Sequence, residues 1–301
     1  MRIGTRRSAL ALAQAELVAS MLGGGTEIVP LVTGGDDGGS PRGDKSRWVD
    51  ELERALLEGR VDLAVHSAKD VPGELAPGTA LLGSPSRAPA EDVLCGAASL
   101  ERLPAGARIG TSSLRRVAQL RAAREDLEVV PLRGNVDTRL AKLATPEQRL
   151  DAIVLARAGL ERLGRGAEVG GALDPARFVP APGQGALALQ GREDDDDARR
   201  AAESLTDADA LCCLRAERAL AAALGADCET PLGAHATIVP GGLLKLRAWV
   251  GLPDGSAWAS DELDGSGEDP ESLGAGVAER LLAVGAERLL AGAREMASSG
   301  G

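Results

Sequence analysis

Residues 2–15 read RIGTRRSALALAQA, which joins a short strand pattern to a helix pattern rich in alanine and leucine. Residues 1–4 have the character of a strand, and residues 8–22 that of a helix with Ser8 near its N-cap. The letters RIGT return at residues 108–111, again before small or hydroxylated residues and a helical stretch. The repeat arises either by chance or because two similar α/β domains begin in the same way. In the second case a ligand would lie between the domains, at the carboxyl ends of their strands.

Strand and helix patterns alternate through the first two thirds of the chain. The further predicted strands are residues 26–32, 61–66, 108–110, 129–132 and 152–155. The predicted helices between them are residues 48–57, 114–124 and 136–143. Such alternation is typical of parallel sheets covered by helices. Residues 33–46 are rich in Gly, Asp, Ser and Pro and predict a long loop.

The last third has a different pattern, that of an α+β unit that begins near Leu205. Its predicted elements are a long helix at 208–224, strands at 243–250 and 256–263, and a terminal helix at 270–294. The turn Pro253-Asp254-Gly255 joins the two strands into a hairpin. The acidic run at residues 193–197 is typical of a solvated face or a helix N-terminus.

Length and composition predict a globular protein of two or three domains, with 301 residues and 44% hydrophobic content. A net charge of −11 disfavours nucleic acid and anionic membrane as partners, and four aromatic residues are too few to stack a series of bases. The two His and four Cys lack the spacing of metal ligands, so we expect no metal site. The first apolar run is shorter than a signal peptide requires, and no stretch reaches the length of a membrane span. We therefore expect a cytoplasmic chain.

Three polar motifs lie where strands end or helices begin. VHSAKDVPG at residues 65–73 ends a strand with His, Ser, Lys and Asp, and is either a ligand site or an ordinary strand exit. TSSLRR at 111–116 is either an anion site at a helix N-terminus or a cap followed by surface arginines. RGNVDTR at 133–139 places one arginine after a strand and a second on the following helix.

The stretch from residue 106 to residue 162 is cationic although the whole chain is acidic. It holds 11 Lys and Arg against 7 Asp and Glu, a net charge of +4. Because the planar guanidinium group donates two parallel hydrogen bonds to a carboxylate, this stretch predicts a ligand with several negative charges. Cys228 follows a helix end and precedes a Pro-containing loop, so it is either a functional thiol or an ordinary loop residue. Cys95, Cys212 and Cys213 fit small core residues.

Together, six segments resemble the porphobilinogen deaminase (hydroxymethylbilane synthase) family. They are RIGTRRSALALAQA (2–15), VHSAKDVP (65–72), GTSSLRR (110–116), LRGNVDTRL (132–140), APGQGAL (181–187) and DCETPLG (227–233). The resemblance spans nearly the whole chain. It implies an α/β fold of two periplasmic-binding-protein-like, doubly wound domains with a cleft between them, and a smaller α+β C-terminal domain. The implied domains are residues 1–86 with 186–204, residues 87–185, and residues 205–301, which carry the cysteine loop.

The resemblance implies a transferase of tetrapyrrole (haem) biosynthesis. In such an enzyme Cys228 holds a dipyrromethane cofactor through a thioether, and four porphobilinogen molecules are joined head to tail on this primer with release of ammonia. Hydrolysis then releases hydroxymethylbilane. Asp70 matches the catalytic carboxylate, and a fixed carboxylate suits the cations that form when ammonia leaves. The expected partner is porphobilinogen, and the expected state is a monomer without metal, membrane or nucleic acid.

The same resemblance assigns the polar residues of the motifs to two ligands, since each pyrrole unit carries an acetate and a propionate. The positions that match cofactor-binding residues are Lys69, Thr111, Ser112, Ser113, Arg115, Arg116 and Arg139. The positions that match substrate-binding residues are Arg6, Ser8, Arg133, Asn135, Arg139, Arg162 and Gln184.

Two segments depart from the family pattern. DKSRWVDELE at residues 44–53 keeps Lys45 and an aromatic residue, Trp48, but has Asp50 where the family commonly has a second lysine. Asp227 stands where a glycine is usual before the cysteine. Two alternatives stay open: a deaminase-like chain without activity, and a solute-binding protein or sensor built on the same two-domain scaffold.

Overall fold

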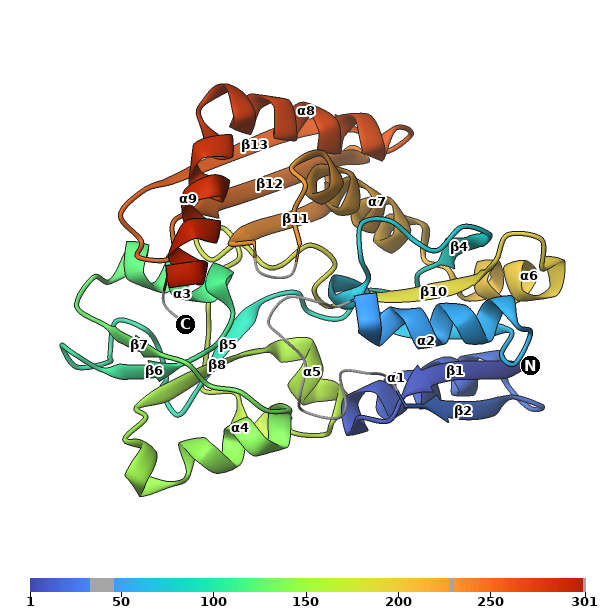
Figure 1. Cartoon of the computed structure of the whole chain (residues 1–301), viewed down its shortest axis with the longest axis horizontal. Coiled ribbons are helices and arrows are strands. Elements are labelled where there is room, and N and C mark those ends of the chain that lie inside the picture. The colour runs from blue at the N-terminus through green and yellow to red at the C-terminus, as the bar shows by residue number, and fades with distance from the viewer. Residues whose placement is uncertain (33–45, 228–229, 300–301) are drawn as a thin grey trace.

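A computed structural model describes residues 1–32, 46–227 and 230–299 as three units, each built on its own sheet (Figure 1). The loop predicted at residues 33–46 lies outside the described residues except for Ser46, where a helix begins. Among the described helices, none has the length and apolar character that crossing a membrane requires.

The first unit is a five-stranded sheet in the order β2-β1-β3-β10-β4. Its strands are β1 (Arg2–Arg6), β2 (Glu27–Leu31), β3 (Leu63–Ser67), β4 (Thr79–Gly83) and β10 (Leu187–Arg192). Helices α1 (Ala9–Leu22) and α6 (Asp196–Leu205) cover one face, and α2 (Ser46–Leu57) covers the other. Successive side chains of β3 point to opposite faces of the sheet, and both faces are buried. Leu63 and Val65 pack with α1, whereas Ala64 packs with α2.

The second unit repeats this strand order as β7-β6-β8-β5-β9. Its strands are β5 (Asp92–Cys95), β6 (Arg108–Gly110), β7 (Glu128–Val130), β8 (Ala152–Ala156) and β9 (Gly171–Ala172). Helix α3 (Leu114–Ala123) packs on one face, and α4 (Val136–Leu143) and α5 (Arg157–Arg162) pack on the other. Strand β6 therefore occupies the place that β1 has in the first unit.

The two units share an equivalent hydrogen bond at the start of their RIGT strands. The backbone N–H of Arg2 donates to the Asp62 carboxylate at 2.7 Å, and the backbone N–H of Arg108 donates to Asp151 at 2.7 Å. In both units an aspartate just before the central strand fixes the start of the RIGT strand. The repeated letters thus mark two similar α/β units, as one of the two interpretations of the repeat predicted.

Both sheets are mixed, and the prediction of parallel sheets is wrong in this respect. Strand β10 runs antiparallel to β3 and β4, and β5 runs antiparallel to β8 and β9. Each of these two strands follows a segment that crosses from one unit to the other, residues 84–91 and 173–186. The alternation of strands and helices along the chain does not reveal the direction of a strand that arrives from another unit.

The third unit is an antiparallel sheet of β11 (Leu232–Val239), β12 (Leu243–Gly251) and β13 (Trp258–Ser266), in that order. Its core also includes α7 (Ala208–Ala223), α8 (Pro270–Ala283) and α9 (Ala286–Ser299). The single terminal helix predicted at 270–294 is wrong, because α8 and α9 are separate. The break includes Gly285, whose φ of 97° lies in the left-handed region that favours glycine after a helix end.

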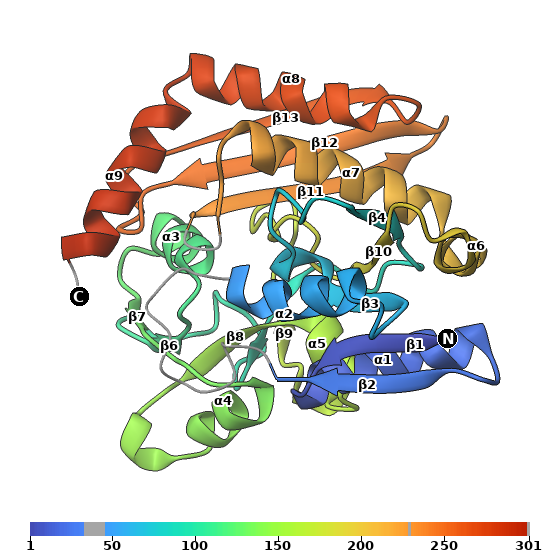
Figure 2. The same ribbon diagram turned by 45° about the vertical axis from the view of Figure 1, so that its right-hand side comes forward.

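Helix α7 connects all three units, and Figures 1 and 2 both show it between the sheet of the third unit and strand β10. Its Glu217 side chain is fully buried and accepts hydrogen bonds from Arg87 at 2.6 and 3.1 Å. The same carboxylate accepts from the backbone N–H groups of Gly183 at 2.6 Å and Ala236 at 2.7 Å. Both crossing segments and β11 therefore meet on one carboxylate. The domain boundaries at residues 86, 185 and 204 stay predictions.

Candidate active site

Strand β3 carries the VHSAKDVP motif to the edge of the first sheet where its parallel strands end. A short 3₁₀ turn, η1 (Ala68–Asp70), follows directly and presents Asp70. Arg218 of α7 holds the next residues, because it donates to the carbonyls of Pro72 and Gly73 at 2.9 and 3.0 Å. Burial lowers the pKa of the Arg218 guanidinium, as expected for a cation enclosed between two units.

Asp70 lines a small pocket of about 60 Å³ at the ends of β1 and β3. Arg6, Ser8 and His66 also line it, so two predicted substrate-binding residues and the predicted catalytic residue lie together. Asp70 is the one carboxylate among the described residues of this lining. Ser8 caps α1 as predicted, since its hydroxyl accepts from the backbone N–H of Ala11 at 3.3 Å.

His66 is a pocket residue that was not among the predicted site residues, although it belongs to the VHSAKDVPG motif, one of whose two interpretations was a ligand site. The side chain is 6% exposed, and within the described part of the chain its Nε2 atom has no hydrogen-bond partner. Burial, with smaller contributions from the charges of Arg6 and Arg218, lowers the pKa of His66 to about 4 against the opposing effects of Gln190 and Asp70. The ring is therefore neutral near pH 7.

The TSSLRR motif forms the N-terminus of α3. Thr111 is buried, and its hydroxyl accepts from the backbone N–H of Ser113 at 3.3 Å. Ser113 occupies the N-cap position but makes no side-chain capping bond, and Ser112 is exposed. The motif thus lies at a helix N-terminus, as both of its interpretations predicted, but Arg115 and Arg116 are buried rather than on the surface. Backbone N–H groups at such an end favour an anion, and the anion site stays a prediction.

Arg115 and Arg116 begin α3 and share one buried carboxylate, that of Asp92 on β5. Asp92 is 1% exposed, and the two arginines are 4% and 7% exposed. Arg115 Nη1 lies 2.8 Å from Asp92 Oδ2, and Arg116 Nη2 lies 2.7 Å from Oδ1. Burial raises the pKa of Asp92, but the two guanidinium groups outweigh it and hold the pKa well below its usual range. The sequence gives only a weak signal for Asp92, because it is a single acidic residue at the start of an apolar stretch.

Lys69 connects the first unit to this cluster. Its ammonium group donates to Gln184 Oε1 at 3.4 Å, and Gln184 Nε2 donates to Asp92 Oδ1 at 2.8 Å and to the carbonyl of Ala90 at 2.7 Å. Burial lowers the pKa of Lys69 to about 8, with Arg116 acting in the same direction and Asp70 and Asp92 opposing it. Gln184 is therefore a buried bridge between the units.

The remaining predicted arginines differ in their surroundings. Arg139 lies on α4 and Arg162 ends α5, and burial lowers the pKa of each to about 10. The charge of Arg116 also lowers the pKa of Arg139, so the two guanidinium groups lie near enough to interact although α3 and α4 cover opposite faces of the sheet. Arg133 and Asn135 are exposed, and Asn135 caps α4 by accepting from the backbone N–H of Thr138 at 2.8 Å. Within the described part of the chain, no hydrogen bond or ion pair joins these two residues to the buried cluster of Asp92 and its arginines.

The donor groups of this region fit a ligand that carries several carboxylates, such as the dipyrromethane that the resemblance implies. Among the described residues, no carboxylate forms an ion pair with Arg133, Arg139 or Arg162. Arg139 and Arg162 donate instead to the carbonyls of Gly134 and Gly185, both at 2.7 Å. Partly buried cations such as Arg139 and Arg162 are less stable without a partner acid, and an anionic ligand would compensate their charge.

Two residues predicted to take part lie outside the described residues. They are Cys228, which the resemblance makes the cofactor attachment, and Lys45. The residues that flank Cys228 are described: the backbone N–H of Asp227 donates to the hydroxyl of Thr230 at 2.9 Å, and β11 begins at Leu232. The backbone N–H of Ala234 donates to the carbonyl of Pro180 at 2.8 Å, so β11 begins beside the second crossing segment.

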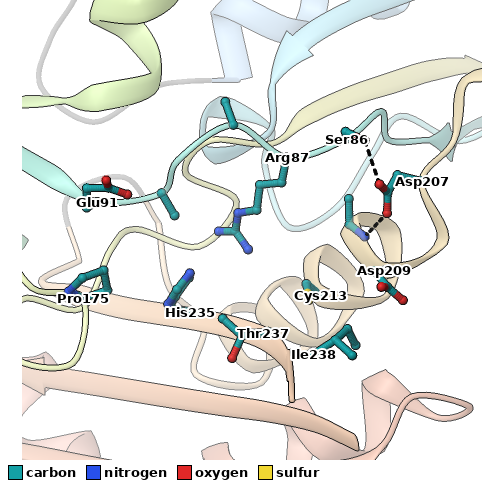
Figure 3. Close-up of a pocket in the computed structure, with 14 residues that line it drawn as sticks. Ser86, Arg87, Glu91, Pro175, Asp207, Asp209, Cys213, His235, Thr237 and Ile238 are labelled. Carbon is teal, nitrogen blue, oxygen red and sulfur yellow. Dashed lines mark hydrogen bonds between the residues drawn. The ribbon is translucent and has the colours of Figure 1, made fainter. Parts of the chain in front are cut away.

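A larger pocket of about 520 Å³ lies elsewhere, where the first crossing segment meets α7 and β11 (Figure 3). Figure 3 shows His235 and Arg87 at its centre, with Asp207 and Asp209 at the start of α7. None of the residues predicted for catalysis or binding is among its described lining residues. The candidate active site is therefore the Asp70 pocket together with the Asp92 cluster.

Comparisons with known proteins show the family of the chain. The family model "Porphobilinogen deaminase, dipyromethane cofactor binding domain" matches residues 1–200, and "Porphobilinogen deaminase, C-terminal domain" matches residues 210–283. Relatives named porphobilinogen deaminase include those of Roseiflexus sp. (44% identical, over 96% of this chain and 98% of the relative) and Deinococcus deserti (43%, over 97% and 98%). That of Thermus thermophilus is 44% identical over 96% of this chain and 97% of its own.

Proposed function

The chain belongs to the porphobilinogen deaminase family, and from this premise we propose that Asp70 is its catalytic residue. The chain is a transferase that joins four porphobilinogen molecules head to tail, with release of ammonia, into hydroxymethylbilane on a covalently attached dipyrromethane. The observation that supports the role of Asp70 is its place in the small pocket. There it is the one described carboxylate, beside Arg6 and Ser8 at the ends of two parallel strands.

Asp70 acts on the charge that develops on the substrate. When ammonia leaves the aminomethyl group of porphobilinogen, positive charge spreads onto the pyrrole ring and its nitrogen. The Asp70 carboxylate stabilises this charge and accepts a hydrogen bond from the ring N–H. Arg218 keeps the carboxylate in place through the residues that follow it, and His66 stays neutral beside it.

The cations of the cleft bind and orient the acetate and propionate groups. A dipyrromethane held by Cys228 through a thioether would supply the pyrrole carbon to which new units are joined. We assign its carboxylates to Lys69, Ser113, Arg115, Arg116 and Arg139, with Thr111 and Ser112 shaping the start of α3. We assign the incoming unit and the growing chain to Arg6, Ser8, Arg133, Arg139 and Arg162, with Asn135 and Gln184 holding the surrounding turns.

We further propose that the protein works as a monomer in the cytoplasm, with porphobilinogen as its partner and without metal, membrane or nucleic acid. Size-exclusion chromatography with light scattering would measure this state directly, and a stable dimer would contradict it.

Mass spectrometry of the intact protein tests the function. We expect the purified chain to carry an adduct of two linked pyrrole units and to consume porphobilinogen, and we expect the Cys228→Ala variant to do neither. A wild-type chain with no adduct and no turnover would contradict the proposal and favour an inactive relative. Binding of an organic anion without turnover would favour a solute-binding protein or sensor.

A further inference from the structure

A buried polar chain runs from helix α2 toward the small pocket of the first unit. In the register of β3 and β10, Gln190 is the diagonal neighbour of His66, and long side chains at such positions reach each other. The Gln190 side chain is 1% exposed. Its Nε2 atom donates to Oε1 of Glu53 on α2 and to Oγ1 of Thr79 on β4, both at 2.8 Å. Gln190 therefore links α2 and β4 to the strand that carries His66.

The neighbours of Gln190 determine which end of its amide is the nitrogen. The Thr79 hydroxyl donates its own proton to the carbonyl of Ala76 at 2.8 Å, so its oxygen is the acceptor toward Gln190. The Glu53 carboxylate also accepts, and it receives the backbone N–H of Ala76 at 2.9 Å as well. Both donors of the Gln190 amide are therefore used, and its Oε1 atom is the end that remains to accept a hydrogen bond.

Two buried atoms on this face of the sheet, Gln190 Oε1 and His66 Nε2, have no hydrogen-bond partner among the described residues. Buried polar atoms are nearly always bonded, and a bond between these two would satisfy both. Because a carbonyl oxygen only accepts, the bond requires that the ring proton is on Nε2. Gln190 raises the pKa of His66, which is the direction expected when its oxygen accepts from the ring.

We propose that Gln190 is a positioning residue that holds the neutral His66 ring with its proton on Nε2. The unprotonated Nδ1 atom then accepts a hydrogen bond from the aminomethyl group of porphobilinogen, in the pocket that His66 lines beside Asp70. The inference rests on the proposed function, because that function supplies the ligand.

A neutral acceptor suits the aminomethyl group because this group leaves during the reaction. Porphobilinogen donates N–H bonds from its ring nitrogen and from its aminomethyl group, and Asp70 is assigned to the first. A second carboxylate at the other group would stabilise the ammonium before it reacts and would oppose its departure. The charged groups that act on the His66 ring are Asp70, Arg6 and Arg218, and burial outweighs the effect of Asp70. The ring therefore orients the aminomethyl group without adding a charge.

Nitrogen NMR of the holoenzyme with isotope-labelled histidine tests the position of the ring proton directly. The chain has only two histidines, so the signals missing in His66→Asn assign the His66 ring. We expect the wild-type ring to carry its proton on Nε2 at neutral pH. In Gln190→Met a proton on the buried Nε2 would lack its acceptor, so we expect the proton to move to Nδ1. The matched control is Thr79→Val, which removes a bond at the other end of the same amide and should keep the wild-type proton position.

Turnover of the same variants, measured below the melting temperature of each, tests the role in the reaction. The side-chain oxygen of asparagine can take the place of Nδ1 as an acceptor, whereas leucine has no acceptor. We expect kcat/KM to fall about tenfold or more in His66→Leu, and His66→Asn to keep several times the activity of His66→Leu. We also expect Gln190→Met to lose more activity than Thr79→Val.

A wild-type His66 ring with its proton on Nδ1 would overturn the inference alone, whatever the variants do. Equal kcat/KM in folded His66→Leu and His66→Asn, or equal losses in Gln190→Met and Thr79→Val, would overturn it as well. If His66→Leu does not fold, the position of the proton in the wild type and in Gln190→Met decides. A wild-type chain without adduct or turnover would instead overturn the proposed function, and this inference with it.

Discussion

Lys69 and Asp70 are adjacent in the chain but serve different parts of the site. The 3₁₀ turn after β3 sends the Lys69 ammonium toward Gln184 and the second unit, while Asp70 lines the pocket of the first unit. Under the proposed function, one turn would thus carry both a cation for the cofactor and the carboxylate for the reaction. Because Arg218 holds the residues that follow, a change in either side chain leaves the path of this turn intact.

His66 makes the stability of the protein depend on pH. Its pKa is about 4 in the folded state, below the ordinary value of 6.5, because burial disfavours the charged ring. The unfolded chain therefore takes up this proton first as the pH falls. We expect the free energy of unfolding to decrease between pH 6.5 and 4, by at most about 3 kcal/mol from this residue. Urea unfolding of the wild type and of His66→Asn across this range would measure the effect.

The matched control is His235→Asn, which removes the other histidine. Burial lowers the pKa of His235 as well, but this residue lies in the larger pocket away from Asp70. Between pH 6.5 and 4, we expect the free energy of unfolding to depend less on pH in His66→Asn than in His235→Asn. Equal slopes in the wild type and in His66→Asn would contradict the assignment.

At the residue scale, sequence motifs identified the side chains but not their partners. VHSAKDVP and TSSLRR predicted Asp70, Lys69 and the paired arginines as candidates, and the structure places them at a strand end and a helix N-terminus. Asp92 lies 23 and 24 positions before the arginines that it binds, in strand β5, which belongs to none of the motifs. Pairings of this kind depend on how strands are ordered, so local patterns contain no signal for them.

At the element scale, the β12–β13 hairpin packs directly on the end of α3. Arg121 donates to the carbonyl of Pro253 in its turn at 3.1 Å. Gly255 has a φ of 78°, and a Cβ there would lie 2.6 Å from the backbone nitrogen of Ala122. We expect Gly255→Ala to destabilise the protein by about 2–5 kcal/mol, since both the left-handed backbone and the close contact resist a side chain. Urea unfolding would measure this loss.

Gly241 provides the control in the other hairpin of the same sheet. It also has a positive φ, 95°, but no atom lies within 4 Å of the position of a Cβ. We expect Gly241→Ala to cost only the backbone strain, about 1–2 kcal/mol. Equal losses of stability in the two variants would show that the close approach of Gly255 to α3 does not hinder a side chain there.

Elements with clear local signals were predicted well. Helix α4 has the predicted bounds, and the acidic run before α6 is a helix N-terminus, since Asp195 is its N-cap. The break at Gly285 was missed because the apolar pattern continues through it, although glycine after a helix is a stop signal. Strands β5 and β9 are four and two residues long and hold their place through pairing, which short windows of sequence do not show.

At the scale of the whole molecule, Glu217 stabilises the junction of the three units. Its buried carboxylate accepts hydrogen bonds from Arg87, Gly183 and Ala236, which belong to both crossing segments and to β11. Replacement by Gln leaves the buried Arg87 guanidinium without its counter-charge. We expect Glu217→Gln to lower the free energy of unfolding by about 3–5 kcal/mol. Urea unfolding followed by circular dichroism would measure the loss.

Glu271→Gln is the matched control, because Glu271 pairs with Arg215 at 2.5 Å on the exposed surface of the third unit. Exposed pairs contribute about 0–1 kcal/mol, so this variant should unfold nearly as the wild type does. A small effect of Glu217→Gln, similar to that of the control, would show that the junction does not depend on the buried pair.

The architecture of the whole chain was predicted from a repeat and from motifs spread along it. The RIGT repeat indicated two similar units, and the family resemblance implied the third. The mixed direction of the sheets was not predicted, because β5 and β10 enter from crossing segments that span the units. The site depends on those crossings, since Gln184 on one of them joins Lys69 to Asp92.

The central claim, that Asp70 catalyses chain growth on Cys228, is tested most directly by the mass of the intact protein after a short pulse of porphobilinogen. We expect the wild type to show a series of masses that differ by one pyrrole unit. We expect Asp70→Asn to keep the wild-type folding transition but to extend the chain about a hundredfold more slowly or worse, because the neutral amide does not stabilise a developing cation. Extension by folded Asp70→Asn at the wild-type rate would contradict the claim.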